Sequence, residues 1–395
     1  MRNPIYLDNN STTPVDPRVL DEMLPYFKEK FGNPSSHQHR YGWLAEDGVD
    51  MALERIGSLI ECREEEFIFT SGATESTNLA LRGLAYTYRN TGKKIITCLT
   101  EHAAVLEPIR ELEQSGIPIQ YLPVQSNGLL DLNQLEEALK KPTFLVCIMM
   151  ANNETGVIQP IQEITQLAHE QGSLIFSDAS QALGKIPVLV DNLGLDLMAC
   201  SSHKLYGPKG VGGLYIRKGS PYIKIKPQIT GGGQQNELRS GTMNVPGIVG
   251  FGKAAEISGQ EMQGEYQKLK TWRDLMETSF LSLPLSYRNG TFENRLPHTL
   301  NLRFDFIKSE QLFQKIPHIA LSTGSACNSA NPEPSHVLLA MGLTEKQARS
   351  SIRISLGRMN TTGEIENAIK DIRLGLENLR NEDVFWLKSK AKELY

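Results

Sequence analysis

The sequence predicts an α/β protein with a mostly parallel, seven-stranded sheet sandwiched by helices in a large domain, plus a smaller α+β domain. Two observations support this fold class. Short apolar runs alternate with helix-length segments as far as residue 216, a pattern that favours parallel strands joined by helical crossovers. Polar residues also follow the apolar runs Ser173–Phe176 and Leu197–Cys200, where buried parallel strands would end. Ligands bind at such strand ends.

The length and composition are those of a globular protein with more than one domain. The chain has 395 residues, of which 40% are hydrophobic and 22% charged, and its net charge is -4. A chain of this length can bury a substantial core. The slightly acidic balance and the lack of a Lys/Arg block argue against direct binding of nucleic acid.

The N-terminus and the cysteines indicate a cytoplasmic protein. Met1–Asp8 lacks the apolar stretch of a secretory signal, and no apolar run reaches membrane-spanning length, so we expect no membrane contact. The cysteines are widely spaced without a Cys-x-x-Cys pair, so neither a disulfide framework nor a metal site is expected. They are Cys62, Cys98, Cys147, Cys200 and Cys327, of which the first four have the surroundings of small core residues.

The large domain is expected over residues 16–252. Asp16 followed by Pro17 is a typical helix start, which predicts a helix to about Phe31. A turn-rich loop follows, and apolar residues at helical spacing predict the next helix over residues 42–60. The strands are expected at Phe67–Thr70, Lys94–Cys98, Pro118–Leu122, Phe144–Met150, Leu174–Phe176, Leu197–Cys200 and Gly213–Ile216, and the helices between them at Thr74–Tyr88, Val105–Gln114, Asp131–Lys140 and Ile161–Gln171.

The smaller domain is expected to contain residues 1–15 and 253–395. Near residues 244–252 the character of the sequence changes, and a long helix is predicted from Ile248 to about Leu281. Fewer strands follow it, which indicates an α+β unit. The later strands are expected at His298–Arg303, His318–Leu321 and Ser351–Leu356, and the later helices at Thr362–Arg380 and Trp386–Tyr395.

Asp178 and Lys204 follow two of the predicted strands and together suit pyridoxal phosphate. The lysine amine would hold the cofactor aldehyde as a Schiff base. The aspartate would keep the pyridine nitrogen protonated, so that the ring can accept electrons. An ordinary ion pair, or two solvated loop charges, is the alternative.

A phosphate cradle is indicated at Thr70–Ser76, where a strand leads into a helix through a turn of small residues. The start of the helix offers unpaired N–H groups to an anion, and the Thr74 hydroxyl adds a donor. Ser201 and His203, after another strand, also suit a phosphate. A plain strand–turn–helix with Thr74 as its cap is the competing interpretation.

Two further segments follow predicted strands. His102 lies just past the strand that ends at Cys98, where its ring could stack on a flat cofactor and exchange protons near neutral pH. An amide from Asn152–Gly156 could fix a phenolic oxygen of the ligand. A histidine that caps the next helix, and ordinary turn chemistry around Asn-Asn, are the alternatives.

The smaller domain offers a thiol and a guanidinium. Ser322–Pro332 has hardly any large side chain, so we expect it to be mobile and exposed, with the Cys327 sulfur as its distinctive atom. An exposed thiol usually implies a use, although an incidental surface cysteine is the alternative. Arg353 alternates with apolar residues in a predicted strand and could hold a carboxylate by two parallel hydrogen bonds, unless it forms a structural salt bridge.

With these residues together, the chain resembles the cysteine desulfurases of the NifS/IscS type, group I, in the class-V aminotransferase family of fold-type-I pyridoxal-phosphate enzymes. The similarity runs nearly end to end, from Tyr6–Pro14 to Ser351–Arg358. Its most specific motifs are Thr70–Ser76, Thr100–His102, Asn152–Gly156, Ser202–Lys204, Arg239–Thr242 and Gly324–Cys327.

The resemblance implies a role for each candidate. Lys204 would carry the cofactor and Asp178 would pair with its pyridine nitrogen. His102 would stack on the ring and take part in catalysis. Arg353 would hold the substrate carboxylate, and Cys327 would take the sulfur. The further contacts implied are Gln181 and Asn153 at the phenolic oxygen, Asn153 also at the substrate, Ala73, Thr74, Ser201 and His203 at the phosphate, and Thr242 at the phosphate of the other subunit's cofactor in a homodimer.

The implied reaction takes sulfur from L-cysteine and releases L-alanine. Lys204 would remove the α-proton, the Cys327 thiolate would attack the substrate sulfur to form an enzyme persulfide, and thiol exchange would pass the sulfur on. An iron–sulfur scaffold protein would be a typical acceptor, for iron–sulfur cluster assembly or tRNA thiolation. Asn328 stands where relatives often carry threonine, and the chain ends at Tyr395 without the tail that helps some relatives to dock a scaffold, so the acceptor stays open.

Two other classes of function stay open on the sequence. One is another pyridoxal-phosphate enzyme of the same fold, either an aminotransferase or a selenocysteine or cystine lyase, for which Cys327 would be dispensable. The other is a binding protein that keeps the fold as a platform for partners. The preference between cysteine and selenocysteine is also undecided.

Overall fold

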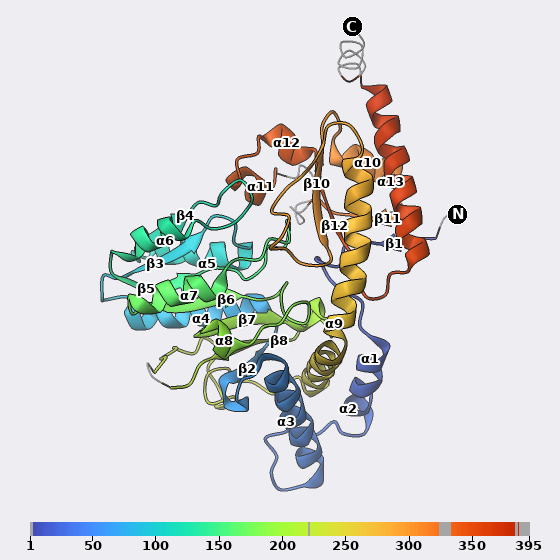
Figure 1. Ribbon diagram of the computed structural model, residues 1–395. Helices are drawn as coiled ribbons and strands as arrows, with labels where there is room; N and C mark the ends of the chain where they lie inside the picture. Colours follow the sequence, from blue (N-terminus) through green and yellow to red (C-terminus); the bar gives the residue numbers. More distant parts are fainter. Residues whose placement is uncertain (1–2, 220–221, 324–332, 384–385, 387–395) are drawn as a thin grey trace.

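A seven-stranded sheet lies at the centre of the larger part of the computed structural model, which describes residues 3–219, 222–323, 333–383 and 386 (Figure 1). The strand order is β2-β8-β7-β6-β5-β3-β4, and within this sheet β8 alone runs against its neighbours. The predicted seven-stranded, mostly parallel sheet is therefore confirmed. Its strands are β2 (Phe67–Thr70), β3 (Lys94–Cys98), β4 (Ile119–Leu122), β5 (Thr143–Cys147), β6 (Leu174–Asp178), β7 (Leu197–Ser201) and β8 (Gly212–Ile216).

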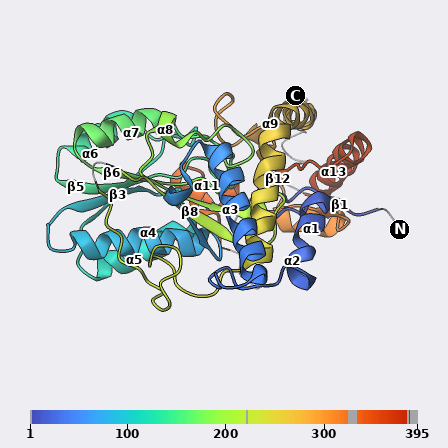
Figure 2. The same ribbon diagram turned by 90° about the horizontal axis from the view of Figure 1, so that it is seen from below.

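Helices cover both faces of this sheet. Figure 2 shows α4 and α5 on one face and α7 and α8 on the other. Successive residues of a buried strand point to opposite faces, and so Leu145 and Val146 of β5 belong to two different apolar cores. The helices of this part are α3 (Arg40–Ile60), α4 (Ala73–Tyr88), α5 (Ala103–Gln114), α6 (Leu132–Leu139), α7 (Ile161–Glu170) and α8 (Val190–Leu193).

The first helix differs from its prediction. Asp16 caps α1 (Pro17–Met23), and its side chain accepts a hydrogen bond from the N–H of Arg18. The helix then breaks and α2 (Pro25–Lys28) follows, so the expectation of one helix to Phe31 is wrong. Proline has no N–H to continue the hydrogen-bond ladder, which explains why the break falls at the proline that begins α2.

The strand expected at Phe144–Met150 is also shorter than predicted, because β5 ends at Cys147. The neighbouring strand β3 has already ended at this level. The N–H of Met149 therefore donates to the side-chain carboxyl of Glu101, at 2.6 Å, instead of to a strand. The apolar run continues past the strand because its residues stay buried as the chain leaves the sheet.

The rest of the chain packs around the long helix α9 (Val245–Leu281), which Figure 1 shows running from beside α3 to the smaller sheets. A three-stranded antiparallel sheet has the order β12-β10-β9, and a parallel pair joins β1 to β11. The strand β9 was not predicted. The elements are β1 (Ile5–Tyr6), β9 (Ser286–Arg288), β10 (Thr299–Phe304), β11 (Ile319–Ala320) and β12 (Ser351–Ser355), with α10 (Ser309–Lys315), α11 (His336–Ala340), α12 (Glu345–Arg349) and α13 (Thr362–Glu382).

Separate apolar cores lie at the large sheet and at the smaller sheets. Ile5 and Leu7 pack with Leu300 and Ile354 in one core, together with residues of α9 and α13. A core of the large sheet extends along α9 as far as Ile257. The membership of α9 residues changes between Ile257 and Leu269, and the boundary at residue 252 stays a prediction. The helix expected at Trp386–Tyr395 lies, apart from its first residue, outside the described residues.

Candidate active site

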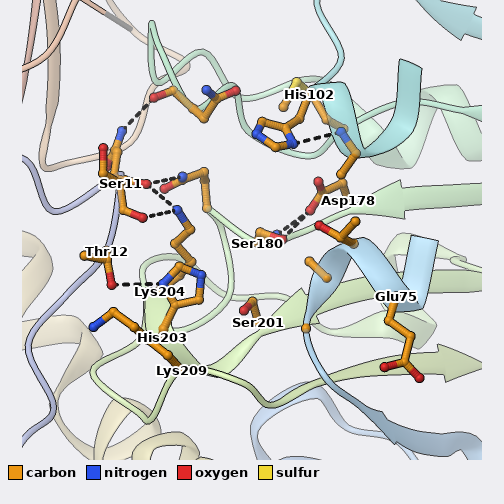
Figure 3. A pocket seen from close by; sticks show the side chains of 18 of the residues that line it. Ser11, Thr12, Glu75, His102, Asp178, Ser180, Ser201, His203, Lys204 and Lys209 are labelled. Carbon is orange, nitrogen blue, oxygen red and sulfur yellow. Dashed lines mark hydrogen bonds between the residues drawn. The ribbon is translucent and has the colours of Figure 1, made fainter. Parts of the chain in front are cut away.

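A cavity of about 560 Å³ lies at the carboxyl edge of the large sheet, where β6 and β7 end and α4 begins (Figure 3). Most of the predicted site residues line it. They are Ala73, Thr74, His102, Asn153, Asp178, Gln181, Ser201, His203, Lys204 and Arg353. Thr242 is exposed and does not line this cavity. Cys327 lies outside the described residues.

The turn between β2 and α4 forms one end of the cavity. Gly72 is the N-cap of α4 with a φ of +155°, and no side chain caps the helix, so the alternative of a Thr74 cap is wrong. A Cβ on Gly212 would meet the Gly72 Cα at 2.6 Å, which shows how closely β8 packs under this turn. The first turn of α4 therefore presents uncapped N–H groups and the positive end of the helix dipole beside Ser201.

An ion pair ties the segment before Thr242 to this turn. The guanidinium of Arg239 donates to the Glu75 carboxylate at 2.8 Å, and the same carboxylate accepts the N–H of Ser71 at 2.7 Å. Figure 3 shows Glu75 pointing away from Lys204. Glu75 thus lines the cavity at this turn and supports the turn through its bonds to Ser71 and Arg239.

Asp178 and His102 lie together on one side of the cavity (Figure 3). Asp178, the last residue of β6, accepts hydrogen bonds at Oδ1 from the N–H and the hydroxyl of Ser180, at 2.9 and 2.5 Å. His102 caps α5, because its Nδ1 accepts the N–H of Ala104 at 3.1 Å. The helix-cap alternative is therefore right, and the ring lines the cavity as well. Burial lowers the pKa of His102, which favours a neutral ring with its proton on Nε2.

Lys204 lies on the opposite side of the cavity from Asp178 (Figure 3). It ends η2 (Ser202–Lys204), a short turn that follows β7 directly. Its amine donates to the carbonyl oxygens of Asn10 and Ser11, at 2.5 and 2.8 Å. The cavity separates the amine from the carboxylate, which is not the arrangement of an ion pair in contact.

Arg353 enters the cavity from β12. Its Nη2 donates to the Asp8 carboxylate and to the Ser11 hydroxyl, each at 2.7 Å, and its Nη1 donates to the Asn153 carbonyl at 3.1 Å. The structural salt bridge, which was the competing interpretation of Arg353, is therefore present. The buried Nε has no hydrogen-bond partner in the part of the chain that the structure describes. A guanidinium with an unused donor beside a cavity suits a ligand carboxylate.

Asn152 and Asn153 have different roles, one in the turn and one at the cavity. The Asn152 side chain makes the turn, because its Oδ1 accepts the N–H groups of Glu154 and Thr155, each at 2.9 Å. Asn153, the next residue, lines the cavity. Turn chemistry and ligand contact therefore belong to adjacent residues.

The N-terminal segment is the part of the site that sequence reasoning missed. Asn10, Ser11 and Thr12 line the cavity, and Thr12 Oγ1 lies 3.0 Å from the Nδ1 of His203. Gln181 also donates to the Asn10 carbonyl, at 2.9 Å. The one signal for this segment was its run of polar residues after the first extended stretch.

The donor set fits pyridoxal phosphate. The cradle offers backbone N–H groups and hydroxyls for a phosphate, one wall offers a carboxylate and an imidazole, and the facing wall offers an amine. A cavity of about 560 Å³ lies within the usual range for small-molecule sites. Among the described residues, no group of three or more His, Cys, Asp or Glu could hold a metal ion.

Comparison with known proteins gives one consistent family. The family model described as aminotransferase class-V matches residues 5–368. A protein of Vibrio campbellii named cysteine desulfurase IscS is 46% identical over 388 residues, which cover 98% of this chain and 96% of that protein. A solved structure named NIFS-like protein has a TM-score of 0.88 at 39% identity and covers 95% of this chain and 99% of its own. Another, named SspA in complex with cysteine, has a TM-score of 0.77 at 36% identity, with 89% and 98% covered.

Proposed function

Because this chain belongs to the class-V aminotransferase family, we propose that it is a pyridoxal-phosphate-dependent cysteine desulfurase that passes sulfur from L-cysteine onward through Cys327. The observation that carries the proposal is the cavity, in which a lysine amine faces a carboxylate and an uncapped helix start. Relatives named for cysteine desulfurization match almost the whole chain, and one solved relative is named in complex with cysteine. Both support cysteine as the substrate.

The residues that hold the cofactor follow from the donor set. Lys204 carries it covalently, Asp178 pairs with its pyridine nitrogen, and His102 stacks on its ring. When bound, pyridoxal phosphate supplies a ring that accepts the electron pair left when the substrate loses its α-proton. The remaining contacts in the proposal are Ala73, Thr74, Ser201 and His203 at the phosphate, and Gln181 and Asn153 at the phenolic oxygen.

The substrate side of the site is formed by Arg353 and Asn153. Arg353 is 3% exposed and already orders the Asn153 carbonyl, so its guanidinium can hold a carboxylate at a fixed place. Lys204, once displaced by the substrate amine, is the base that takes the α-proton. The neutral ring of His102 can exchange a proton at Nε2 while Nδ1 stays committed to the helix cap.

The described ends of the segment that contains Cys327 support its role. Before it, Ser322 exchanges backbone hydrogen bonds with Arg353, at 2.7 and 3.3 Å. After it, the Ser335 hydroxyl donates to the buried carboxyl of Glu154. Both attachments lie beside cavity residues. The Cys327 thiolate attacks the substrate sulfur, the S–S bond forms, and the substrate C–S bond breaks with its electron pair left on carbon.

The experiment that tests the function is direct. Purified protein loaded with pyridoxal phosphate should release equal amounts of alanine and sulfide from L-cysteine in the presence of a thiol reductant. An aminotransferase would instead form a 2-oxo acid and convert the cofactor to its amine form, and a binding protein would turn over nothing. Release of a 2-oxo acid without sulfide would contradict the proposal.

The acceptor and the cellular setting remain proposals as well. We propose an acceptor protein such as an iron–sulfur scaffold, in iron–sulfur cluster assembly or tRNA thiolation, which agrees with the IscS name of the relatives. The described helices include none with the length and apolarity needed to cross a membrane.

Cofactor retention and subunit association should be linked in a homodimer. Thr242 is exposed in one subunit, yet Arg239 joins its segment to the phosphate cradle, so it is available to reach a second subunit's cofactor. A ligand that binds only the dimer stabilises the dimer. Sedimentation at falling protein concentration should show that the apoprotein dimer dissociates at a higher protein concentration than the cofactor-loaded dimer. In Thr242→Ala the two dissociation concentrations should lie closer together.

The matched control for this prediction is Thr91→Ala, which removes another exposed threonine that does not line the cavity. It should sediment as the wild type does. A dilute monomer that keeps its full complement of cofactor would argue against a shared phosphate site.

A further inference from the structure

We propose that the carbonyl oxygens of Asn10 and Ser11 form a seat for the Lys204 amine whenever the lysine is not joined to the cofactor, and that Asn10 is the positioning residue that fixes this seat. The two hydrogen bonds from Nζ, at 2.5 and 2.8 Å, define the lysine seat. The inference rests on the proposed function for its cofactor.

Every polar atom of Asn10 takes part in a hydrogen bond, and together these bonds hold the residue in place. It is 1% exposed. Its Nδ2 donates to the Asn153 carbonyl and to Thr299 Oγ1, each at 3.0 Å. Its Oδ1 accepts from His298 Nε2 at 2.9 Å, and its backbone N–H donates to Ser355 Oγ at 2.9 Å. The Asn10 carbonyl therefore cannot turn away from Lys204 without breaking contacts to β10, β12 and the loop after β5.

The contacts to Asn153 and His298 fix which way the Asn10 amide points. Burial, together with the charges of Lys185 and Arg273, holds the pKa of His298 well below its usual range, so the ring is neutral. The Asn153 carbonyl can only accept, so the amide nitrogen of Asn10 faces it and Oδ1 faces the ring. The neutral ring must then carry its proton on Nε2 for Oδ1 to accept.

Ser11 completes the seat from the substrate side. Its N–H donates to the Asp8 carbonyl at 3.1 Å, and its hydroxyl accepts from Arg353. The Asn10 carbonyl also accepts from Gln181, which lines the cavity beside it. The seat is thus joined to the proposed substrate-binding and cofactor-binding residues.

The two carbonyl oxygens can bind the Lys204 amine in two states, in the apoprotein and during turnover. In the apoprotein it aims the amine into the cavity before the cofactor arrives. During turnover Lys204 takes the substrate α-proton: the new N–H bond forms on Nζ, the Cα–H bond breaks, and its electron pair stays on the substrate. The resulting ammonium can donate to both carbonyls. Hydrogen bonds of this kind stabilise the charged form of an amine over the neutral form.

Other charged or titratable groups line the same cavity as the Lys204 amine and oppose or assist the seat. Asp178 from β6 favours the ammonium form. The positive charges of Arg353 from β12 and Lys209 from the loop before β8 disfavour it. The titratable rings are His102 at the start of α5, whose pKa burial lowers, and His203 in η2, whose pKa is lowered to about 4 by burial and then by Lys204 and Lys209. Both rings are neutral near pH 7, so Asp178 assists the seat and the two cations oppose it.

The test uses the apoprotein, in which Lys204 is not joined to the cofactor. Pyridoxal phosphate is added over a range of pH, and covalent attachment is followed by its absorbance band and by the mass of the borohydride-reduced Lys204 peptide. Only a neutral amine attacks the aldehyde. The pH at which the attachment rate is half-maximal, the midpoint, therefore reports the pKa of the Lys204 amine. The rate at high pH, the plateau, reports how well the amine is oriented toward the aldehyde.

Two variants should move the midpoint in opposite directions. Asn10→Ala releases the seat, so the ammonium form loses stabilisation; we expect the midpoint to fall by about one pH unit and the plateau to fall about tenfold. Asn10→Asp has nearly the same shape, but it exchanges the Nδ2 donor for an acceptor and adds a negative charge; we expect the charge to dominate and the midpoint to rise by about one unit. Loosened packing alone would not give opposite shifts.

The matched control is Asn9→Ala. Asn9 is also buried and also bonds to Ser355, but its side chain bonds only the backbone there, at 2.9 Å, and does not line the cavity. It should keep the wild-type midpoint and plateau. An Asn10→Ala protein with wild-type values, or an Asn9→Ala protein that shifts equally, would overturn the proposal.

If Asn10→Ala does not fold, Asn10→Asp decides, because a midpoint that fails to rise overturns the seat. A wild-type apoprotein that attaches no pyridoxal phosphate at all would overturn the proposed function and the seat with it. Wild-type attachment with unmoved variants would overturn the seat alone.

Discussion

Lys204→Ala should purify without covalently attached pyridoxal phosphate and should lose turnover of cysteine by about 10³-fold or more, because the variant lacks both the attachment point and the base. The amine of Lys204 lies in the cavity opposite Asp178, where no backbone group can replace it. Borohydride reduction followed by peptide mass analysis measures the link. Turnover is measured as alanine formed from cysteine.

Lys209→Ala is the matched control, since Lys209 is a second amine that lines the same cavity. Lys209 is exposed and lies further along the chain from the end of β7 than Lys204 does. This control should keep the reducible link. A reducible link of unchanged yield in Lys204→Ala would mean that another amine carries the cofactor, and the assignment would be wrong.

Sequence reasoning predicted the large sheet well because its signal is local. A buried parallel strand needs apolar residues on both faces, and Leu197–Cys200 and Lys94–Cys98 show this as short runs between helices. The strand β9 (Ser286–Arg288) gave no such signal, because its residues are half-buried or exposed and depend on pairing with β10. Pairing with a distant partner leaves little trace in the strand itself.

The residues that line the cavity could be predicted where their type carries a distinctive chemistry. Asp178, His102 and Lys204 were identifiable because a carboxylate, an imidazole and an amine each carry a distinctive chemistry and each follows a strand. Asn10 and Ser11 were missed because they serve through backbone carbonyl oxygens, which every residue has. The pairing of β1 with β11 brings them to the cavity from the other end of the chain. No local pattern could have shown that contact.

The four cysteines other than Cys327 have thiols that are poor nucleophiles near neutral pH. Cys98, Cys147 and Cys200 are buried in the apolar cores, and burial raises the pKa of each thiol, to about 11 for Cys98. Burial and the nearby Glu66 raise the pKa of the partly buried Cys62 to about 12. A thiol with a raised pKa is rarely ionised near neutral pH, and the thiolate is the nucleophile. None of the four is suited to take sulfur from a substrate.

Cys327→Ala should therefore keep the covalent link to Lys204 and still let cysteine displace it, because neither step uses the Cys327 thiol. Alanine and sulfide formation should fall to near background, since a methyl group cannot attack sulfur. Cys62→Ala, the best matched control because it is the most accessible of the other four thiols, should keep turnover. The decisive measurement is alanine formed from cysteine by Cys327→Ala with its cofactor band intact. Wild-type turnover there would mean that sulfur never passes through Cys327, and the desulfurase mechanism would have to be abandoned.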